Sequence, residues 1–115
     1  MLKPLDIRDL GKRDLIPQAI IRRPLSYFEK QGLRGFVHDY DALDYFRGAA
    51  FLLDDDVPFA LMHHRGCPDN ETTVYSTRDF SEDIKKITTS IRHILAALHL
   101  NSDSLIWERK DDPDL

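Results

Sequence analysis

The residues best suited to chemistry lie in one short segment, His-His-Arg-Gly-Cys-Pro, which begins at residue 63. The segment holds two of the five histidines, the single cysteine and an arginine. A thiolate is the reactive form of cysteine, and a neighbouring imidazole or cation lowers the pKa of the thiol. His63 or His64 beside Cys67 therefore forms a candidate catalytic pair, and Arg65 and Glu71 are candidate binding residues.

The same segment lacks a complete set of metal ligands. A zinc site needs at least three protein ligands, and one of these histidines with Cys67 supplies two. If a strand runs through His63 and His64, their side chains point to opposite faces of the sheet, because side chains alternate along a strand. We therefore expect no metal and no cofactor. A lone cysteine is more often a small loop residue than a nucleophile, which favours a protein that is not an enzyme.

Acidic residues gather before the middle of the chain without forming a known type of site. Asp39, Asp41 and Asp44 lack the glycine and the distal glutamate of an EF-hand loop. No glycine-rich phosphate loop accompanies them. We assign them to a solvated turn or short helix that leads into the next strand.

Two apolar segments separated by three aspartates predict a β-hairpin. The strands are expected over Gly48–Leu53 and Val57–Arg65, with Asp54–Asp56 as the turn. Thr72–Thr77, rich in threonine and other β-formers, predicts a third strand that continues an antiparallel meander. Pro58 lies near the start of its strand, where the missing N–H is best tolerated.

A long amphipathic helix is predicted over Phe80–Leu100. Asp79 is a suitable N-cap, and Glu82 stands three residues later, as in a capping box. His99 and Asn101 suit the C-terminal end of a helix. The apolar residues recur at alternating steps of three and four, and they form one stripe that needs a sheet to cover. They are Ile84, Ile87, Ile91, Ile94, Leu95 and Leu98.

The opposite side of this helix is small and sparsely charged. At about 100° per residue it contains Thr89, Ser90, His93, Ala96 and Ala97. Such a surface allows close approach by another chain. We therefore expect self-association or partner docking there, with Ser90, His93 and Ala97 as binding residues.

Residues 1–35 are interrupted by prolines and glycines and predict an irregular N-terminal arm. Short helical turns are expected over Pro4–Gly11 and Pro24–Gly32. Between them, Gln18–Arg23 predicts a short strand, since it contains two consecutive β-branched isoleucines. The arm carries many apolar residues, so we expect it to wrap the domain or to pair with a neighbouring chain.

These elements predict one α+β domain over residues 1–115. Its two layers are the helix at about 80–100 and a four- to five-stranded antiparallel or mixed sheet, with the helix packed on one face. A right-handed crossover through the helix leads to a final short strand, Leu105–Arg109, expected to lie parallel to its partner. Cystatin-like and helix-grip layouts share this arrangement of layers.

Size and charge restrict the class of partner. The chain has 115 residues, of which 42% are hydrophobic and 31% charged, and a net charge of −4. The negative charge argues against nucleic acid, whose binding normally needs a basic face. The longest apolar run, Ala49–Leu53, is too short to cross a membrane. Cys67 alone cannot form an internal disulfide, so a cytoplasmic location is expected.

For function, we expect a small soluble protein that binds or regulates others through protein contacts, as an oligomer, and is not an enzyme. Two alternatives stay open: a small enzyme that uses the cluster at residues 63–71, and a domain that binds a small-molecule ligand. The ligand alternative depends on aromatic residues in the N-terminal half, which suit either core packing or a cleft. They are Tyr27, Phe28, Phe36, Tyr40, Tyr45 and Phe46.

Overall fold

The computed structural model describes residues 2–12, 14–40, 45–54, 57–77 and 84–109. Its strands are β1 (Leu2–Leu5), β2 (Leu15–Ile21), β3 (Val37–Tyr40), β4 (Tyr45–Leu53), β5 (Val57–His64), β6 (Thr72–Thr77) and β7 (Leu105–Glu108). Its helices are α1 (Ile7–Gly11), α2 (Leu25–Lys30) and α4 (Ile84–Ala97), and a 3-10 turn covers Ser102–Ser104. None of the helices in this described part is long and apolar enough to cross a membrane.

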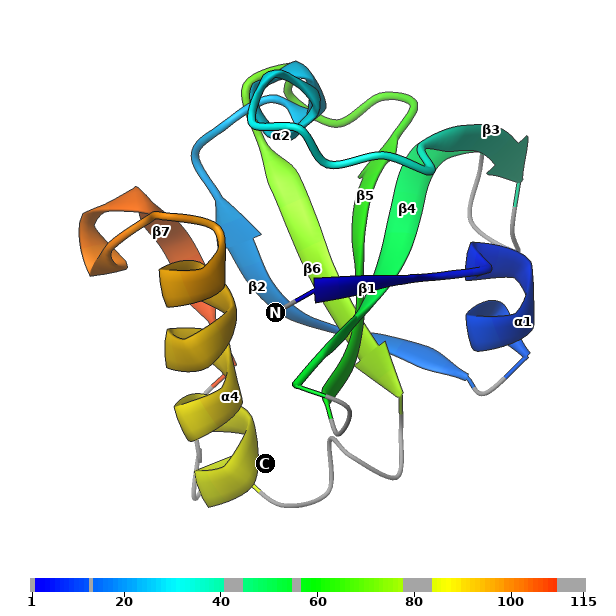
Figure 1. The fold of residues 1–115 in the computed structure, drawn as a ribbon. Coiled ribbons are helices and arrows are strands. Elements are labelled where there is room, and N and C mark those ends of the chain that lie inside the picture. Colours follow the sequence, from blue (N-terminus) through cyan, green and yellow to red (C-terminus); the bar gives the residue numbers. More distant parts are fainter. Residues whose placement is uncertain (1, 13, 41–44, 55–56, 78–83, 110–115) are drawn as a thin grey trace, which may run out of the picture.

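All seven strands belong to one antiparallel sheet, whose order is β1-β4-β5-β6-β2-β7, with β3 also paired to β4. β3 pairs with residues 45–48 of β4, and β1 pairs with residues 50–53 of the same strand. Because β5 occupies the opposite edge of β4, β1 and β3 follow one another along a single edge. Figure 1 shows α1 beside this edge and α4 beside β2 and β7.

The predicted α+β fold, with four to five strands and one long helix, is wrong. The described chain is mostly β, with seven strands in one antiparallel sheet and three short helices. The two strands that were not predicted, β1 and β3, have four residues each, which is too short for an alternating pattern to be recognised. The cystatin-like and helix-grip layouts are wrong for the same reason, since no helix within the described residues has the length that they require.

The helix in the C-terminal part ends earlier than predicted, and its predicted start at Phe80 lies outside the described residues. α4 covers Ile84–Ala97, and the chain leaves it through His99, whose φ of 60° is left-handed. The N–H of Leu100 donates to the carbonyl of Leu95 at 2.8 Å, which closes the helix end. Asn101 instead caps the following 3-10 turn. The predicted cap at Asp79 and Glu82 lies outside the described residues.

The last strand does not pair in the predicted direction. β7 is antiparallel to its partner β2, and β2 lies between β6 and β7. The crossover through α4 therefore passes over β2, which comes from the N-terminal region and was predicted only in part, as Gln18–Arg23. The sheet is consequently antiparallel throughout, not mixed.

The hairpin and the meander are confirmed. β4 and β5 pair from Phe46 with His64 to Leu53 with Val57, and β6 has the predicted bounds. Pro58 lies before residues 60–62, where β5 pairs with β6, so its missing N–H costs no bond in that ladder. The Ser76 hydroxyl donates to the Pro58 carbonyl at 2.7 Å.

The N-terminal region is more regular than the predicted arm. The helical turn from Pro4 is wrong, because Pro4 lies in β1, an edge strand that tolerates proline. The helix instead begins after Asp6, whose side chain accepts from the Arg8 N–H at 2.9 Å, and ends at Gly11. The turn after Pro24 is confirmed as α2.

Two apolar clusters lie on the two faces of the sheet. The α2/α4 face is the larger and comprises buried residues of four strands, of α2, and of α4 with the residue that follows it: Ala19, Ile21, Leu25, Phe28, Ala49, Phe51, Leu53, Val57, Phe59, Leu61, Val74, Ile91, Ile94, Leu95 and Leu98. The α1 face comprises Ile7, Leu10, Phe46, Ala50, Ala60 and Met62. The predicted stripe of the helix is thus confirmed from Ile91 to Leu98, whereas the side chains of Ile84 and Ile87 lie outside the described part.

Candidate functional site

The ends of three neighbouring strands, β3, β4 and β5, bring six polar and aromatic side chains together. Antiparallel pairing places residues directly opposite one another, and alternate residues share a face. One row runs through His38, Arg47 and His63, which are successive partners across the strands. The second row runs through Tyr40 and its partner Tyr45 to Arg65, whose N–H donates to the Tyr45 carbonyl at 2.8 Å. We call these six residues the tyrosine–arginine surface.

The second row is a stack of exposed groups. The rings of Tyr40 and Tyr45 meet edge to face with centroids 5.8 Å apart, and the Arg65 guanidinium lies 4.9 Å from the Tyr45 centroid. Tyr40 is 71% exposed and Tyr45 57% exposed. Two adjacent tyrosines with an arginine present a large amphipathic area at small conformational cost, which is typical of binding surfaces.

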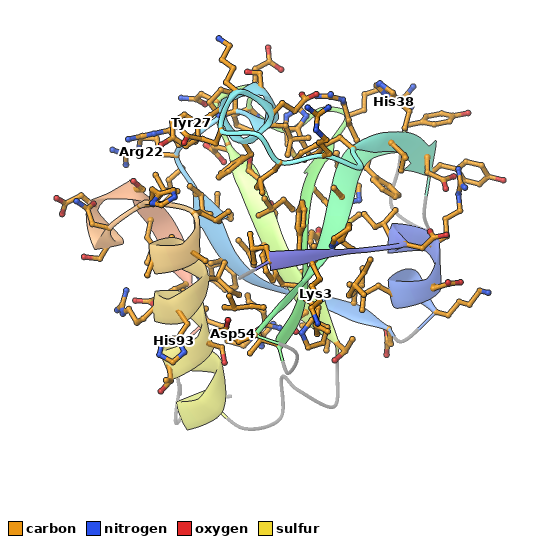
Figure 2. All side chains as sticks on the ribbon, viewed as in Figure 1. Lys3, Arg22, Tyr27, His38, Asp54 and His93 are labelled. Carbon is orange, nitrogen blue, oxygen red and sulfur yellow. The ribbon has the colours of Figure 1, made fainter. Side chains whose placement is uncertain are left out.

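Arg47 ties the first row to α2. It forms an ion pair with Glu29 and lies 5.6 Å from the centroid of the Phe36 ring. The hydrogen bond from Arg47 lowers the pKa of Glu29, and the charge of the arginine adds to this effect. Arg47 is therefore fixed in place at the rim. Its partner on β3 is His38, which Figure 2 shows at the outer end of the sheet.

His63 is held by the turn that follows β5. Its Nε2 lies 3.2 Å from the carbonyl oxygen of Cys67 and 3.1 Å from that of Pro68. Both oxygens are acceptors, so Nε2 carries the proton and donates. The imidazole is consequently directed at the backbone of the turn, and this nitrogen is not positioned as a base for the Cys67 thiol.

The six side chains surround a shallow depression of about 660 Å³, to which Asp39 and Phe46 also contribute. This volume lies within the range of ligand sites. The depression contains four basic or imidazole groups and one carboxylate. That carboxylate, Asp39, is already bound by Arg8 from outside the six, and Arg47 is paired with Glu29, so the groups that the depression presents are chiefly Arg65, the two imidazoles and the two tyrosine rings.

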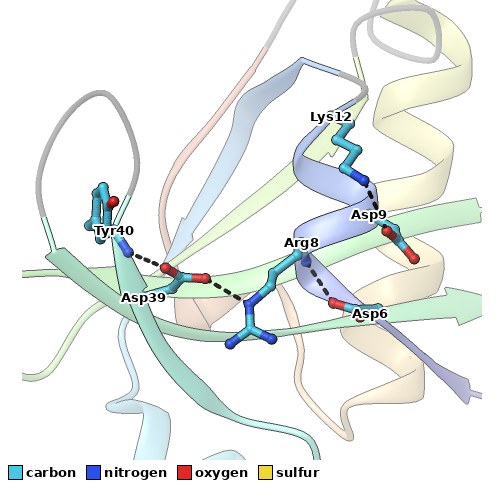
Figure 3. Close-up of polar contacts among 6 residues, drawn as sticks. All are labelled: Asp6, Arg8, Asp9, Lys12, Asp39 and Tyr40. Carbon is cyan, nitrogen blue, oxygen red and sulfur yellow. Dashed lines mark hydrogen bonds and ion pairs between the residues drawn. The ribbon is translucent and has the colours of Figure 1, made fainter.

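The residues that alternate with these six on the same strand ends, Asp39, Phe46 and His64, point to the α1 face. Asp39 accepts from the Arg8 Nε at 3.0 Å and from the Tyr40 N–H at 2.9 Å (Figure 3). The Tyr40 N–H and then Arg8 lower the pKa of Asp39, and Asp39 in turn raises the pKa of Arg8. His64 is buried, with its ring 5.6 Å from Phe46.

The structure separates the residues of the predicted chemical cluster. His63 and Arg65 share the tyrosine–arginine surface, whereas His64 points to the other face, which confirms the predicted alternation. Cys67 is a free, exposed thiol in the turn, and Glu71 is half-buried at its end. Within the described ranges, no three histidine, cysteine or acidic residues come together as a metal site.

The predicted binding face of the helix is only partly present. Ser90 is buried, 6% exposed, and so does not lie on the outer side as expected. Ala97 is half-buried and packs against the α2/α4 core. His93 and Ala96 are exposed. The exposed side of α4 is thus narrower than the helical wheel predicts, because the buried side includes Ser90 and part of Ala97 as well as the apolar stripe.

Tyr40 and Tyr45 were named from the sequence only among the aromatic residues of a core or a cleft, and not as candidate binding residues of an exposed surface. The aromatic group of the N-terminal half was assigned chiefly to the core, and Phe28 and Phe46 do lie there, at 0% and 9% exposure. The missed signal is the alternation Tyr45-Phe46-Arg47, which continues the strand backward from Gly48 and places one ring inside and one outside.

Comparison of the chain with protein-family models, with curated proteins and with solved structures gives no match. Function must therefore be argued from the geometry and chemistry of the surface itself.

Proposed function

We propose that this protein is a non-enzymatic binding protein that contacts a protein partner through the tyrosine–arginine surface. The observation that carries the proposal is the exposed stack of Tyr40, Tyr45 and Arg65. Tyrosine and arginine are enriched among the residues that dominate binding energy at interfaces. An isolated domain gains little from exposing two adjacent rings, so this arrangement supports a role in recognition.

The charge of the surface indicates the kind of partner. The chain as a whole carries a net charge of −4, yet this depression contains Arg47, Arg65 and two histidines. We propose a partner segment that presents carboxylates, because complementary charge directs encounter and orientation. The overall negative charge does not favour nucleic acid. The free, exposed Cys67 suits a reducing compartment, so we propose the cytoplasm as the location.

Affinity capture with matched variants tests the proposal. The wild-type protein and the double variant Tyr40→Ser/Tyr45→Ser are immobilised, and retained proteins are identified and then titrated individually in purified form. We expect a partner whose affinity falls by at least about thirtyfold in the double variant, equivalent to about 2 kcal/mol. Arg65→Gln is expected to weaken the same partner by a smaller factor.

The control is Ile106→Ser/Trp107→Ser, which removes two exposed apolar residues of β7 at the far edge of the sheet. It should leave the affinity of that partner within about twofold of wild type. If no purified protein binds saturably, or if binding is lost in the β7 variant and kept in the tyrosine variant, the assignment of this surface is wrong.

A further inference from the structure

A second cavity lies on the α1 face and shares Asp39, Tyr40 and Phe46 with the depression described above. Its volume is about 480 Å³, which is within the range of small-molecule sites. Its apolar lining comes from α1, β2, β4, β5 and β6 and comprises Ile7, Leu15, Phe46, Met62 and Tyr75. Its rim is charged and comprises Arg8, Lys12, Asp14 and Asp39.

Two glycines define the shape of this cavity. A Cβ on Gly48 would lie 2.8 Å from the Leu61 carbonyl and 3.1 Å from the Ile7 Cδ1, so the absence of a side chain lets the first turn of α1 lie against β4. A Cβ on Gly11, at the other end of α1, would meet nothing within 4 Å. The helix is therefore close to the sheet at Ile7, whereas its Gly11 end leaves open space over the lining.

Arg8 supplies hydrogen-bond donors at the rim. Its guanidinium has five N–H groups, and Asp39 engages the one on Nε. Among the described residues, the two terminal amino groups of Arg8 make no hydrogen bond, and Figure 3 shows them pointing away from Asp39 and Tyr40. They form a planar pair of donors that matches the two oxygens of a carboxylate.

Lys12 adds a second cation to the rim. Its contact with Asp9 is 3.5 Å long, and both side chains are mostly exposed, so this pair holds the ammonium only weakly. Lys12 directly follows Gly11 in the sequence, and both residues line the cavity.

We propose that this cavity binds a small carboxylate with an aromatic or branched apolar body. The body lies against Phe46 and Met62, and the carboxylate accepts from the terminal amino groups of Arg8, with Lys12 nearby. The proposal rests on the hydrogen-bond donors of Arg8 and on the apolar lining. It does not rest on net charge, because the rim has equal numbers of cations and carboxylates. The site does not depend on the partner proposed above.

Nuclear magnetic resonance with small probes tests this site. The probes are 3-phenylpropionate, its neutral amide and propionate, and the readouts are the methyl resonances of Met62 and Ile7. We expect saturable shifts with 3-phenylpropionate, affinity lower by roughly three- to fivefold with the amide, as for a partly exposed ion pair, and no saturation with propionate. The absence of saturable shifts with 3-phenylpropionate, or equal affinity for the acid and the amide, would overturn the proposal.

Variants locate the binding. Gly11→Leu places a side chain into the open space and should abolish the shifts at Met62, whereas the matched control Ser26→Leu, on the exposed side of α2, should not. Arg8→Gln should reduce the affinity for the acid to that of the amide and leave the amide unchanged. Arg8 is 65% exposed, so this variant retains the fold. Equal loss in the Ser26→Leu control, or unchanged binding in Gly11→Leu, contradicts the assignment.

Discussion

The two faces of the sheet differ in how completely they are covered, although the same strands build both. The α2/α4 face buries fifteen of the described apolar residues beneath two helices, and its largest rings are 0–3% exposed. The α1 face buries six, beneath a helix of five residues, and it borders a cavity. The comparison indicates that stability comes mainly from the first face, where the strand ends that carry the tyrosine–arginine surface stay exposed, whereas the second face is less filled and leaves a cavity.

The strand residues explain this difference. Toward α2 and α4, β4 and β5 present Phe51, Phe59 and Leu61, which fill the space beneath long side chains of both helices. Toward α1, the same strands present Gly48, Ala50 and Ala60, which are small. Small residues allow a short helix to approach closely, but a helix of five residues cannot extend over the whole face. A cavity beyond its end is the consequence.

The largest predicted effect is the loss of a core ring on the α2/α4 face. Phe59→Ala should lower the free energy of unfolding by about 3–5 kcal/mol, because Phe59 is 0% exposed and the surrounding side chains cannot fill the cavity that it leaves. Urea denaturation followed by circular dichroism measures this change. A loss below about 1 kcal/mol would show that this face does not dominate stability.

An intermediate effect is predicted where α1 meets β4. Gly48→Ala places a Cβ 2.8 Å from the Leu61 carbonyl and 2.9 Å from the Met62 Cγ, so it should cost roughly 1–3 kcal/mol through overpacking. Gly11→Ala is the matched control, because its Cβ meets nothing and it stands in a helix. That change should be neutral or stabilise by up to about 1 kcal/mol. If both variants lose the same stability in urea denaturation, the close approach of α1 is not what Gly48 provides.

The sequence was sufficient where an apolar pattern extends over enough residues. The hairpin of β4 and β5 consists of two apolar runs with a polar turn between them, the stripe of α4 has the period of a helix, and each was predicted. β1 and β3 have four residues each, and Pro4 lowers the strand propensity of β1 further. Their position depends on the free edge of β4, which is a tertiary property that local propensity does not contain.

The same limit explains the candidate site. The cluster at residues 63–71 was found from residue type alone. His63 and His64 lie on opposite faces of the sheet because successive side chains alternate along β5. Tyr40 and Tyr45 become neighbours because β3 folds back on β4, and Arg65 joins them through β5. With β3 unrecognised, no sequence pattern indicated that these rings share an exposed face.

The smallest predicted effect concerns the ion pair of Arg8 and Asp39, which joins α1 to β3 at the rim of the cavity. The pKa of Asp39 is lowered in the folded state by the Tyr40 N–H and by Arg8. A depressed pKa means that the folded state binds a proton less readily than the unfolded chain, so the stabilisation is present above the ordinary aspartate pKa of about 3.9. It is lost as the pH falls through the lower, folded-state value.

Asp39→Asn measures this contribution directly. Wild type should exceed the variant in urea midpoint at pH 5–7, and the difference should shrink below about pH 4, because the protonated carboxyl also lacks the charge. The effect is small since Arg8 is 65% exposed and solvent screens the pair. A double-mutant cycle with Arg8→Gln separates the two causes. The interaction free energy between the two substitutions reports the ion pair, and the part of the Asp39→Asn effect that persists without Arg8 reports the bond from the Tyr40 N–H. A difference that grows toward low pH has the wrong sign for a carboxylate stabilised in the fold, and would mean that Asp39 is not held by these donors.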